Sequence, residues 1–219
     1  KSHNEGGKSM PKDQDIQAFK QAFMNNLYSM RGQDENFATP NDHYMTLAYT
    51  VRDRLMERWR RTVQTYFETN PKTVYYLSAE YLPGRQLIQN LISLNAVELA
   101  REALAELGLS LNDLKAQETE PGLGNGGLGR LGACFLDSMA TLEIPNVGYG
   151  IRYEFGIFRQ TFENGSQVER PDDWLYFGNP WEFPQPDDMV EVKFGGHTES
   201  YIDDIGRYRV RWVPERTVL

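Results

Sequence analysis

Apolar residues at every third or fourth position predict helices in the first part of the chain. The first such set is Ile16, Phe19, Phe23 and Leu27. A longer set predicts a second helix, ending near Asn70: Tyr44, Leu47, Ala48, Val51, Leu55, Trp59 and Tyr66. Thr39 can cap the start of this helix, Pro40 suits its first turn, and Asp42 can complete a capping box. Helices are also predicted over residues 85–94 and from starts near Asn95 and Ser110.

Strands are predicted where apolar and polar residues alternate, mostly in the second half of the chain. Residues 73–77, TVYYL, are β-branched and aromatic, which predicts a buried strand. Alternation predicts further strands over residues 147–153, 190–194 and 208–212, the last with a wet face of Arg207, Arg209 and Arg211. Residues 157–162 and 167–170 flank Asn164-Gly165, a strong hairpin signal. The expected fold class is therefore α/β, helical first and β-rich towards the C-terminus.

A glycine-rich stretch, EPGLGNGGLGRLGACFLDS, covers residues 120–138. It leads into apolar residues at helical spacing: Leu128, Leu131, Phe135, Leu136, Met139 and Leu142. A glycine loop therefore enters a helix N-terminus, where the first N–H groups lack helical acceptors and the dipole adds about half a positive charge. Because glycine lets a ligand approach the main chain, this junction suits a phosphate group.

Other interpretations of the glycine loop are weaker. Gly124–Gly129 fits the dinucleotide pattern G-x-G-x-x-G, but that motif needs a preceding strand, and residues 111–120 are polar and helix-like. The Walker pattern fails because no Gly-Lys-Ser/Thr follows. A loop whose glycines serve only packing stays as the alternative to an anion site.

Composition describes a soluble globular protein. The 219 residues carry a net charge of −8, which argues against a nucleic-acid-binding face, and no apolar run is long enough to span a membrane. The single Cys134 excludes an internal disulfide and is expected to be a small buried residue in a reducing compartment. The N-terminus lacks the apolar core of a signal peptide, so we expect a cytoplasmic protein with a disordered tail over residues 1–14.

The residues alone show no catalytic constellation and no metal-ligand spacing. His3, His43 and His197 lie in unrelated contexts. The paired carboxylates at 172–173 and 187–188 are expected to be loop or cap residues.

Residues 121–160 closely resemble the glycogen/starch (α-glucan) phosphorylases. The likeness extends through residues 38–42, 50–54, 75–85, 172–175 and 178–182, and covers nearly all of 16–219. It implies that residues 15–219 form an incomplete N-terminal lobe, Rossmann-like, of a two-lobed GT-B type glycosyltransferase whose C-terminal lobe is missing. The apolar run at residues 216–219 also suggests that the chain is a fragment.

The resemblance also implies an activity. Family members use inorganic phosphate to release terminal α-1,4-glucosyl units as glucose 1-phosphate, with pyridoxal phosphate held by a lysine of the C-terminal lobe. The chain alone would then be inactive and contain no catalytic residue. A short non-catalytic sugar-phosphate-binding or dimerisation module is the alternative from another class, and a related glycosyltransferase that uses nucleotide sugars is a third.

Site residues follow from the same resemblance. Five residues match the loop that faces substrate: Asn125, Gly126, Gly127, Leu128 and Leu131. Gly127, Arg130 and Arg85 match positions near the cofactor, although either arginine could equally be a structural ion-pair partner. Leu82 stands where some members have a cofactor-contacting tyrosine, and Gly132 replaces a common alanine.

Residues on the second helix resemble an effector site. Trp59, Gln64 and Phe67 align with positions that hold a nucleotide at the dimer interface of regulated members, and Asp34 and Phe37 align with the partner's side. Val63 and Phe67 replace a glutamine and a tyrosine, which removes hydrogen-bonding groups and argues against AMP activation. The family implies a homodimer. The five arginines of this helix, at 52, 54, 58, 60 and 61, are expected to form a solvated basic face.

Overall fold

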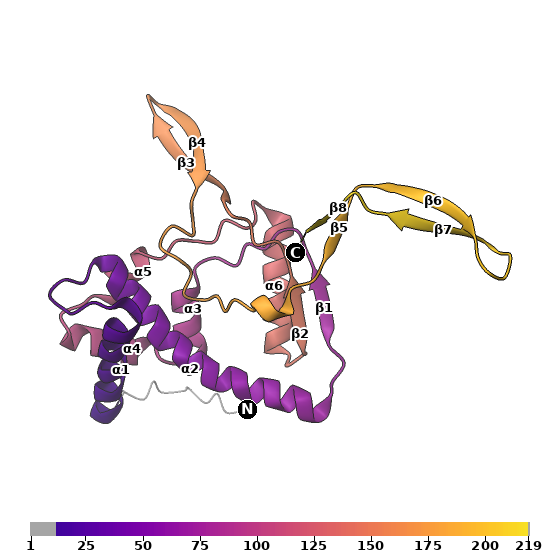
Figure 1. The fold of residues 1–219 in the computed structure, drawn as a ribbon. Coiled ribbons are helices and arrows are strands. Elements are labelled where there is room, and N and C mark those ends of the chain that lie inside the picture. The colour runs from indigo at the N-terminus through magenta and orange to yellow at the C-terminus, as the bar shows by residue number, and fades with distance from the viewer. Residues whose placement is uncertain (1–11, 219) are drawn as a thin grey trace, which may run out of the picture. The chain divides into compact units, whose positions relative to one another are not determined.

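A computed structural model describes residues 12–218 and divides the chain into two compact units, one ending at Trp181 and one formed by Glu182–Leu219 (Figure 1). The first unit contains α1 (Asp13–Arg31), α2 (Pro40–Thr69), β1 (Val74–Leu77), α3 (Gln86–Ser93), α4 (Val97–Glu106), α5 (Leu111–Ala116), α6 (Gly127–Thr141), β2 (Asn146–Tyr149), β3 (Gly156–Glu163) and β4 (Ser166–Asp172). The second contains the short 3-10 helix η1 (Pro186–Asp188), β5 (Val192–Phe194), β6 (His197–Ile202), β7 (Tyr208–Val213) and β8 (Arg216–Val218). This mixture of helices and strands fits the expected α/β class.

The expected disordered tail falls mainly outside the described residues, which begin at Lys12. Within them, α1 already starts at Asp13. None of the helices in residues 12–218 combines the length and the apolar character that a membrane span requires.

The core of the first unit is helical. All four apolar residues predicted for the first helix are buried on one side of α1: Ile16, Phe19, Phe23 and Leu27. They pack with the N-terminal half of α2 and with α3, α4 and α5, whose buried side chains include Leu47, Val51, Leu87, Leu91 and Leu104. The spacing of apolar residues therefore identified the buried face of α1 and of the N-terminal half of α2, whereas Trp59 and Tyr66 of the same predicted set are exposed.

Replacing Phe23 with alanine is expected to lower the free energy of unfolding by about 3–5 kcal/mol, because the side chain is 1% exposed and leaves a cavity. Tyr28 lies on the same helix but is 54% exposed, so Tyr28→Ala should cost no more than about 0.5 kcal/mol. Urea denaturation of both variants measures the difference. Similar losses in the two variants would contradict this assignment of the core.

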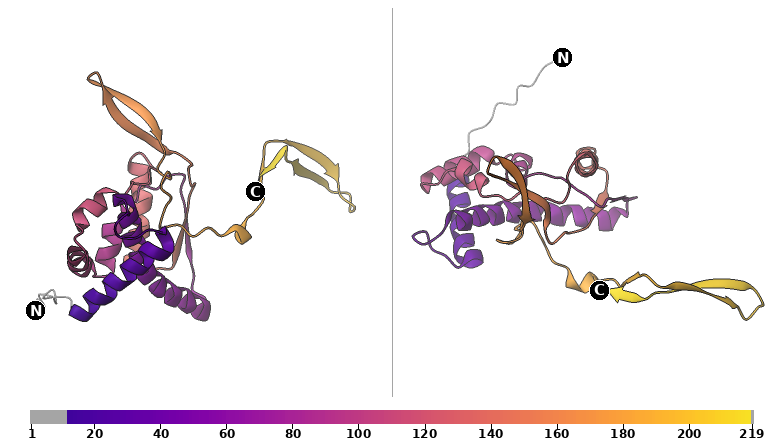
Figure 2. Two further views of the ribbon diagram at one scale, coloured as in Figure 1. Left: turned by 60° about the vertical axis from the view of Figure 1, so that its left-hand side comes forward. Right: turned by 90° about the horizontal axis from the view of Figure 1, so that it is seen from above.

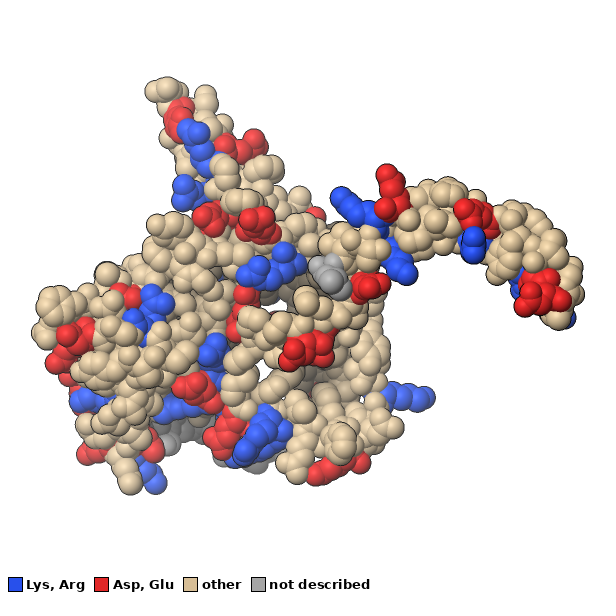
Figure 3. Space-filling model, in the orientation of Figure 1, with Lys and Arg blue, Asp and Glu red and all other residues tan. Residues whose placement is uncertain are grey.

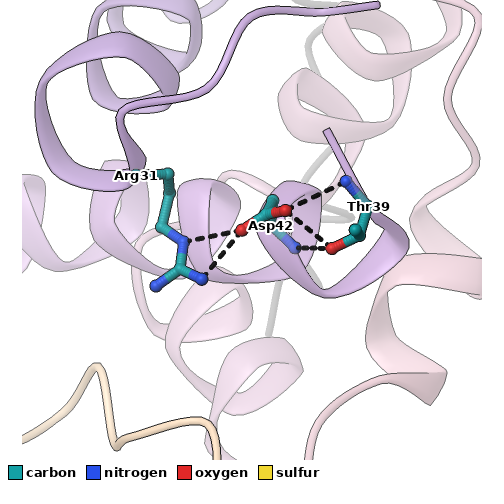
Figure 4. A network of polar contacts seen from close by, with 3 residues as sticks. All are labelled: Arg31, Thr39 and Asp42. Carbon is teal, nitrogen blue, oxygen red and sulfur yellow. Dashed lines mark hydrogen bonds and ion pairs between the residues drawn. The ribbon is translucent and has the colours of Figure 1, made fainter. Parts of the chain in front are cut away.

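The corner between α1 and α2 is fixed by a polar cluster of three residues (Figure 4). The Asp42 N–H donates to Thr39 Oγ1 at 3.2 Å, and the Thr39 N–H donates to Asp42 Oδ2 at 3.0 Å, which completes the predicted capping box. Arg31, at the end of α1, donates from Nε and Nη2 to Asp42 Oδ1 at 3.0 and 2.8 Å. One carboxylate therefore caps α2 and anchors α1.

Asp42 gives the fold a defined pH dependence. Burial raises the pKa of its carboxyl group, but hydrogen bonds from Thr39 and Arg31 outweigh burial and hold the pKa below 3.8. A depressed pKa adds stability that is complete above the unfolded value and is lost as the pH falls through the folded one. The stability difference between wild type and Asp42→Asn should therefore be constant above about pH 5 and shrink below about pH 4. Urea titrations between these limits measure it, and a difference that grows on acidification would contradict the sign.

A parallel strand pair lies beside α6. β1 pairs with β2 in the register Val74↔Asn146 to Leu77↔Tyr149, and α3 to α6 form the connection between them. Three of the four β1 residues are exposed, so the prediction of a buried strand was wrong: in the described residues, β1 has β2 as its only strand neighbour. β2 ends at Tyr149, and the predicted alternation up to Tyr153 is not part of it.

The remaining strands form hairpins. β3 and β4 are joined by Asn164 and Gly165, both with positive φ, which confirms the predicted hairpin; Figures 1 and 2 show it projecting from the rest of the first unit. In the second unit, β6 pairs with β7 and β5 pairs with β8. Arg209 and Arg211 are exposed and form ion pairs with Asp203 and Glu199, which confirms a solvated arginine face.

Candidate functional site

The glycine loop lies against the segment that follows β1. The Tyr81 N–H donates to Leu123 O at 3.1 Å, and the Leu82 N–H donates to Gly129 O at 3.0 Å. These bonds hold the loop and the first turn of α6 beyond the carboxyl end of β1, which is where open α/β sheets bind ligands. In the described chain the element before the loop is α5, so the rejection of a dinucleotide motif is confirmed.

The loop contains two kinds of glycine. A Cβ on Gly124 would lie 3.2 Å from the Tyr81 carbonyl carbon and 3.3 Å from the Gly129 Cα, so these two glycines permit close backbone packing. A Cβ on Gly126 or Gly127 would meet no atom within 4 Å. Packing and ligand approach, the two interpretations left open by the sequence, therefore apply to different glycines of one loop.

The N-terminus of α6 is open to a ligand. Gly126 is its N-cap and can offer no side-chain hydrogen bond, and the first turn contains no acidic residue. The first helical N–H groups therefore have no acceptor in the helix, and the dipole favours an anion in front of them. Two carboxylates lie near the loop: the Asn125 N–H donates to Glu80 Oε2 at 3.3 Å, and Asp172 lies beside Gly122. The geometry suits a phosphoryl group approaching Gly126 and Gly127.

Much of the apolar face of α6 is exposed in the described residues. Leu128 and Leu131 are 60% and 48% exposed, and Phe135 and Leu142 are exposed as well. The buried positions are small instead: Gly129, Gly132 and Ala133. Glycine at position 132 avoids a close contact, because a Cβ there would lie 3.2 Å from the Tyr81 ring. Leu128 and Leu131 are thus accessible beside the open glycines. Cys134, expected to be buried, is half-buried.

The two arginines predicted near the cofactor meet in one cavity. Arg85 and Arg130 line a cavity of about 500 Å³ at the carboxyl ends of β1 and β2, together with Arg152. The five residues predicted to face substrate do not line it. Arg152 was missed in the sequence, although its position three residues after the end of β2 could have indicated it. The cavity therefore includes Leu123 of the loop and Arg130 of α6, but none of residues 125–128.

The residues resembling an effector site lie on the exposed C-terminal half of α2. Trp59 and Phe67 are 62% and 90% exposed, and Gln64 donates to Glu68 at 2.8 Å. Phe37 is exposed in the loop between α1 and α2, after Asp34. These residues are well placed to contact another molecule.

The basic face expected on α2 is only partly solvated. Arg52 donates to Pro180 O at 2.9 Å and stacks on Tyr49, and Arg54 lies over the Phe19 ring, so both are half-buried. Burial lowers the pKa of Arg54, and the charge of Asp15 partly offsets this. Arg58, Arg60 and Arg61 are exposed, as predicted.

A buried carboxylate holds the backbone at the start of α3, next to Arg85. Glu118 is 3% exposed and accepts hydrogen bonds from Gln86 N at 2.8 Å and Leu87 N at 3.1 Å, which are the first amides of α3. It also accepts from Trp181 Nε1 at 3.3 Å. Burial, and then the charge of Glu118, raise the pKa of Tyr44. Because Arg85 is the N-cap of α3, Glu118 fixes the backbone from which Arg85 extends. Glu118 lies in the polar segment of residues 111–120, and nothing in the sequence distinguished it from the other polar residues there.

The loop, the parallel strand pair and the helix N-terminus form an α/β module whose geometry suits a phosphate group, and the comparisons agree with the α/β class. The carbohydrate phosphorylase family matches residues 104–219, and the chain belongs to this family. It is 57% identical over 198 residues to a glycogen phosphorylase of Synechocystis, covering 90% of this chain and 23% of that protein. It is 48% identical over 205 residues to the brain form of glycogen phosphorylase of Homo sapiens, covering 94% and 24%. The chain thus spans about a quarter of the length of these relatives.

Proposed function

We infer that this chain forms part of the N-terminal lobe of an α-1,4-glucan phosphorylase with the two-lobed GT-B architecture. In the overall reaction the bond from C1 of a terminal glucosyl unit to the glucan oxygen breaks, and a bond from C1 to a phosphate oxygen forms. A proton from phosphate ends on the glucan hydroxyl, and glucose 1-phosphate leaves. The observation that carries the proposal is the pair of open glycines, Gly126 and Gly127, at the uncapped N-terminus of α6.

The chain's own residues would bind and stabilise rather than transfer protons. The amides at the start of α6 can donate to the transferring phosphate and favour its negative charge. Asn125 and the exposed side chains of Leu128 and Leu131 offer one polar and two apolar contacts to the sugar. The groups that move protons would belong to the rest of the polypeptide.

Pyridoxal phosphate fits part of this site. The open space in front of Gly127 admits a phosphate to its N–H, so Gly127 would face the cofactor phosphate. Arg85 and Arg130 line the neighbouring cavity, from which they would add positive potential without needing to contact it. When bound, the cofactor supplies a phosphate that exchanges a proton with the substrate phosphate.

The partners of the proposed enzyme are an α-glucan, inorganic phosphate and a second copy of the chain. The exposed Trp59, Val63 and Phe67 on α2, with Phe37, support a homodimer, because exposed aromatic side chains are typical of interfaces. Val63 and Phe67 offer no hydrogen bond to a nucleotide, so AMP activation is not part of the proposal. We expect the protein in the cytoplasm.

The test is an assay of the native polypeptide that contains this chain, with an α-1,4-glucan and inorganic phosphate. Release of glucose 1-phosphate that requires both substrates supports the proposal. Binding of glucose 1-phosphate without turnover favours the non-catalytic module instead. Glucosyl transfer from a nucleotide sugar would favour a different glycosyltransferase.

A further inference from the structure

The chain contains two Asn-Gly sequences, Asn125-Gly126 in the glycine loop and Asn164-Gly165 between β3 and β4. The side-chain amide of an asparagine is open to attack by the backbone nitrogen of the next residue, and a glycine there removes the Cβ that would hinder the attack. Asparagine is accordingly one of the thermolabile residues of proteins. Because the two dipeptides are identical, any difference in their reactivity comes from the structure around them.

The backbone of Asn164-Gly165 is fixed by the hairpin. Both residues have positive φ, 50° and 79°, and the flanking residues Glu163 and Ser166 are paired with each other at the end of the β3–β4 ladder. Attack by the Gly165 nitrogen closes a five-membered ring that includes the bond from Cα to the carbonyl carbon of Asn164. Closing this ring fixes the rotation about that bond, so the hairpin turn has to be disrupted before Asn164 reacts.

The backbone of Asn125-Gly126 is less constrained. Asn125 is exposed and belongs to no helix or strand. Its N–H donates to Glu80 Oε2, but within residues 12–218 neither its side-chain amide nor the Gly126 N–H forms a hydrogen bond. A Cβ on Gly126 would meet no atom within 4 Å. The attacking nitrogen and the attacked amide are thus both free of partners in the described chain.

We propose that Asn125 is a site of spontaneous deamidation and reacts faster than Asn164. The Gly126 nitrogen loses its proton to water and attacks the side-chain carbonyl carbon of Asn125. The bond from that carbon to the amide nitrogen breaks, and ammonia leaves. Water then opens the resulting succinimide at one of its two carbonyl carbons, which gives aspartate or isoaspartate at position 125. Water is the only co-reactant, and nothing is oxidised or reduced.

Deamidation adds a negative charge in front of α6. Residue 125 directly precedes Gly126, the N-cap of a helix whose first turn contains no acidic residue, and the helix dipole favours a carboxylate there. Acidic and basic side chains are interspersed over the face in view in Figure 3, and the net charge is already −8, so one more carboxylate on the general surface would change little. At position 125 it would repel the phosphate that the proposed function places before Gly126 and Gly127. This consequence rests on the proposed function, whereas the deamidation itself does not.

The test is to age the native polypeptide at mildly alkaline pH and to measure aspartate and isoaspartate at both positions by peptide mass spectrometry. Modification at position 125 is expected to accumulate severalfold faster than at position 164. Gly126→Ala should slow it severalfold at position 125, because the methyl group hinders the attack, and should leave position 164 unchanged. The new methyl group has open space, so the variant keeps the fold. Equal rates at the two positions, faster reaction at Asn164, or no effect of Gly126→Ala would overturn the proposal.

The variant Asn125→Asp separates the modification from its consequence. It is expected to slow phosphorolysis of an α-glucan about tenfold or more through charge repulsion, whereas Asn164→Asp in the β3–β4 turn should react as the wild type does. Inorganic phosphate should protect position 125 from deamidation and leave position 164 unprotected. Rapid deamidation of Asn125 together with full activity of Asn125→Asp would support the modification site and contradict the phosphate position of the proposed function.

Discussion

Replacing Gly127 with valine is expected to reduce glucose 1-phosphate formation by roughly 100-fold or more while the protein stays folded. The new side chain would meet no atom of the described structure within 4 Å of its Cβ, so the fold does not oppose it. It would instead fill the space through which a phosphoryl group reaches the first amides of α6. The measurement is the initial rate of glucan phosphorolysis by the native polypeptide, together with its melting temperature.

Gly124→Val is the matched control within the same loop. Its Cβ would lie 3.2 Å from the Tyr81 carbonyl carbon and 3.3 Å from the Gly129 Cα, and backbone cannot move aside as a side chain can. We expect a loss of about 1–3 kcal/mol in stability from this overpacking. If Gly127→Val unfolds the protein, or leaves the rate unchanged, the division into open and packed glycines is wrong.

Replacing Glu118 with leucine is expected to lower the free energy of unfolding by about 3 kcal/mol or more. The change leaves the first two amides of α3 and the Trp181 indole N–H without their acceptor in a buried place. Glu118→Gln keeps one acceptor oxygen and should cost only about 1 kcal/mol. Chemical denaturation of both variants measures the difference. Equal stability of the leucine variant and the wild type would show that the carboxylate does not cap α3.

Local signals predicted the elements that depend on neighbouring residues. The capping box of Thr39 and Asp42 lies within four residues, and the Asn164-Gly165 turn needs only the backbone conformations that these residues tolerate. The helical core followed from the spacing of apolar residues on α1 and α2. Each of these features is determined by residues that lie close together in the sequence.

Burial depends on partners that periodicity cannot identify. Leu128 and Leu131 lie on the apolar face of α6, yet they are 60% and 48% exposed in the described residues. β1 is β-branched and aromatic, and its burial was predicted from composition, but in the described chain it pairs with β2 alone. An apolar pattern indicates a face that can be covered, and what covers it is a property of the assembled protein.

The sequence identified the segment that forms the candidate site but not the three-dimensional arrangement of its residues. The glycine loop was recognisable in sequence, whereas the distinction between Gly124 and Gly127 depends on the segment after β1, more than 40 residues earlier. The cavity lined by Arg85, Arg130 and Arg152 combines residues from three separate segments, and Glu118 acts on α3 from about 30 residues further along the chain. Contacts of this kind arise only from tertiary structure.

A crystal structure of the native polypeptide with glucose 1-phosphate would test the central claim most directly. The account predicts a phosphoryl oxygen about 2.7–3.2 Å from the Gly127 backbone nitrogen, with the sugar beside Leu131. A phosphoryl group bound away from the N-terminus of α6, with the space in front of Gly126 and Gly127 left to solvent or filled by protein, would contradict it.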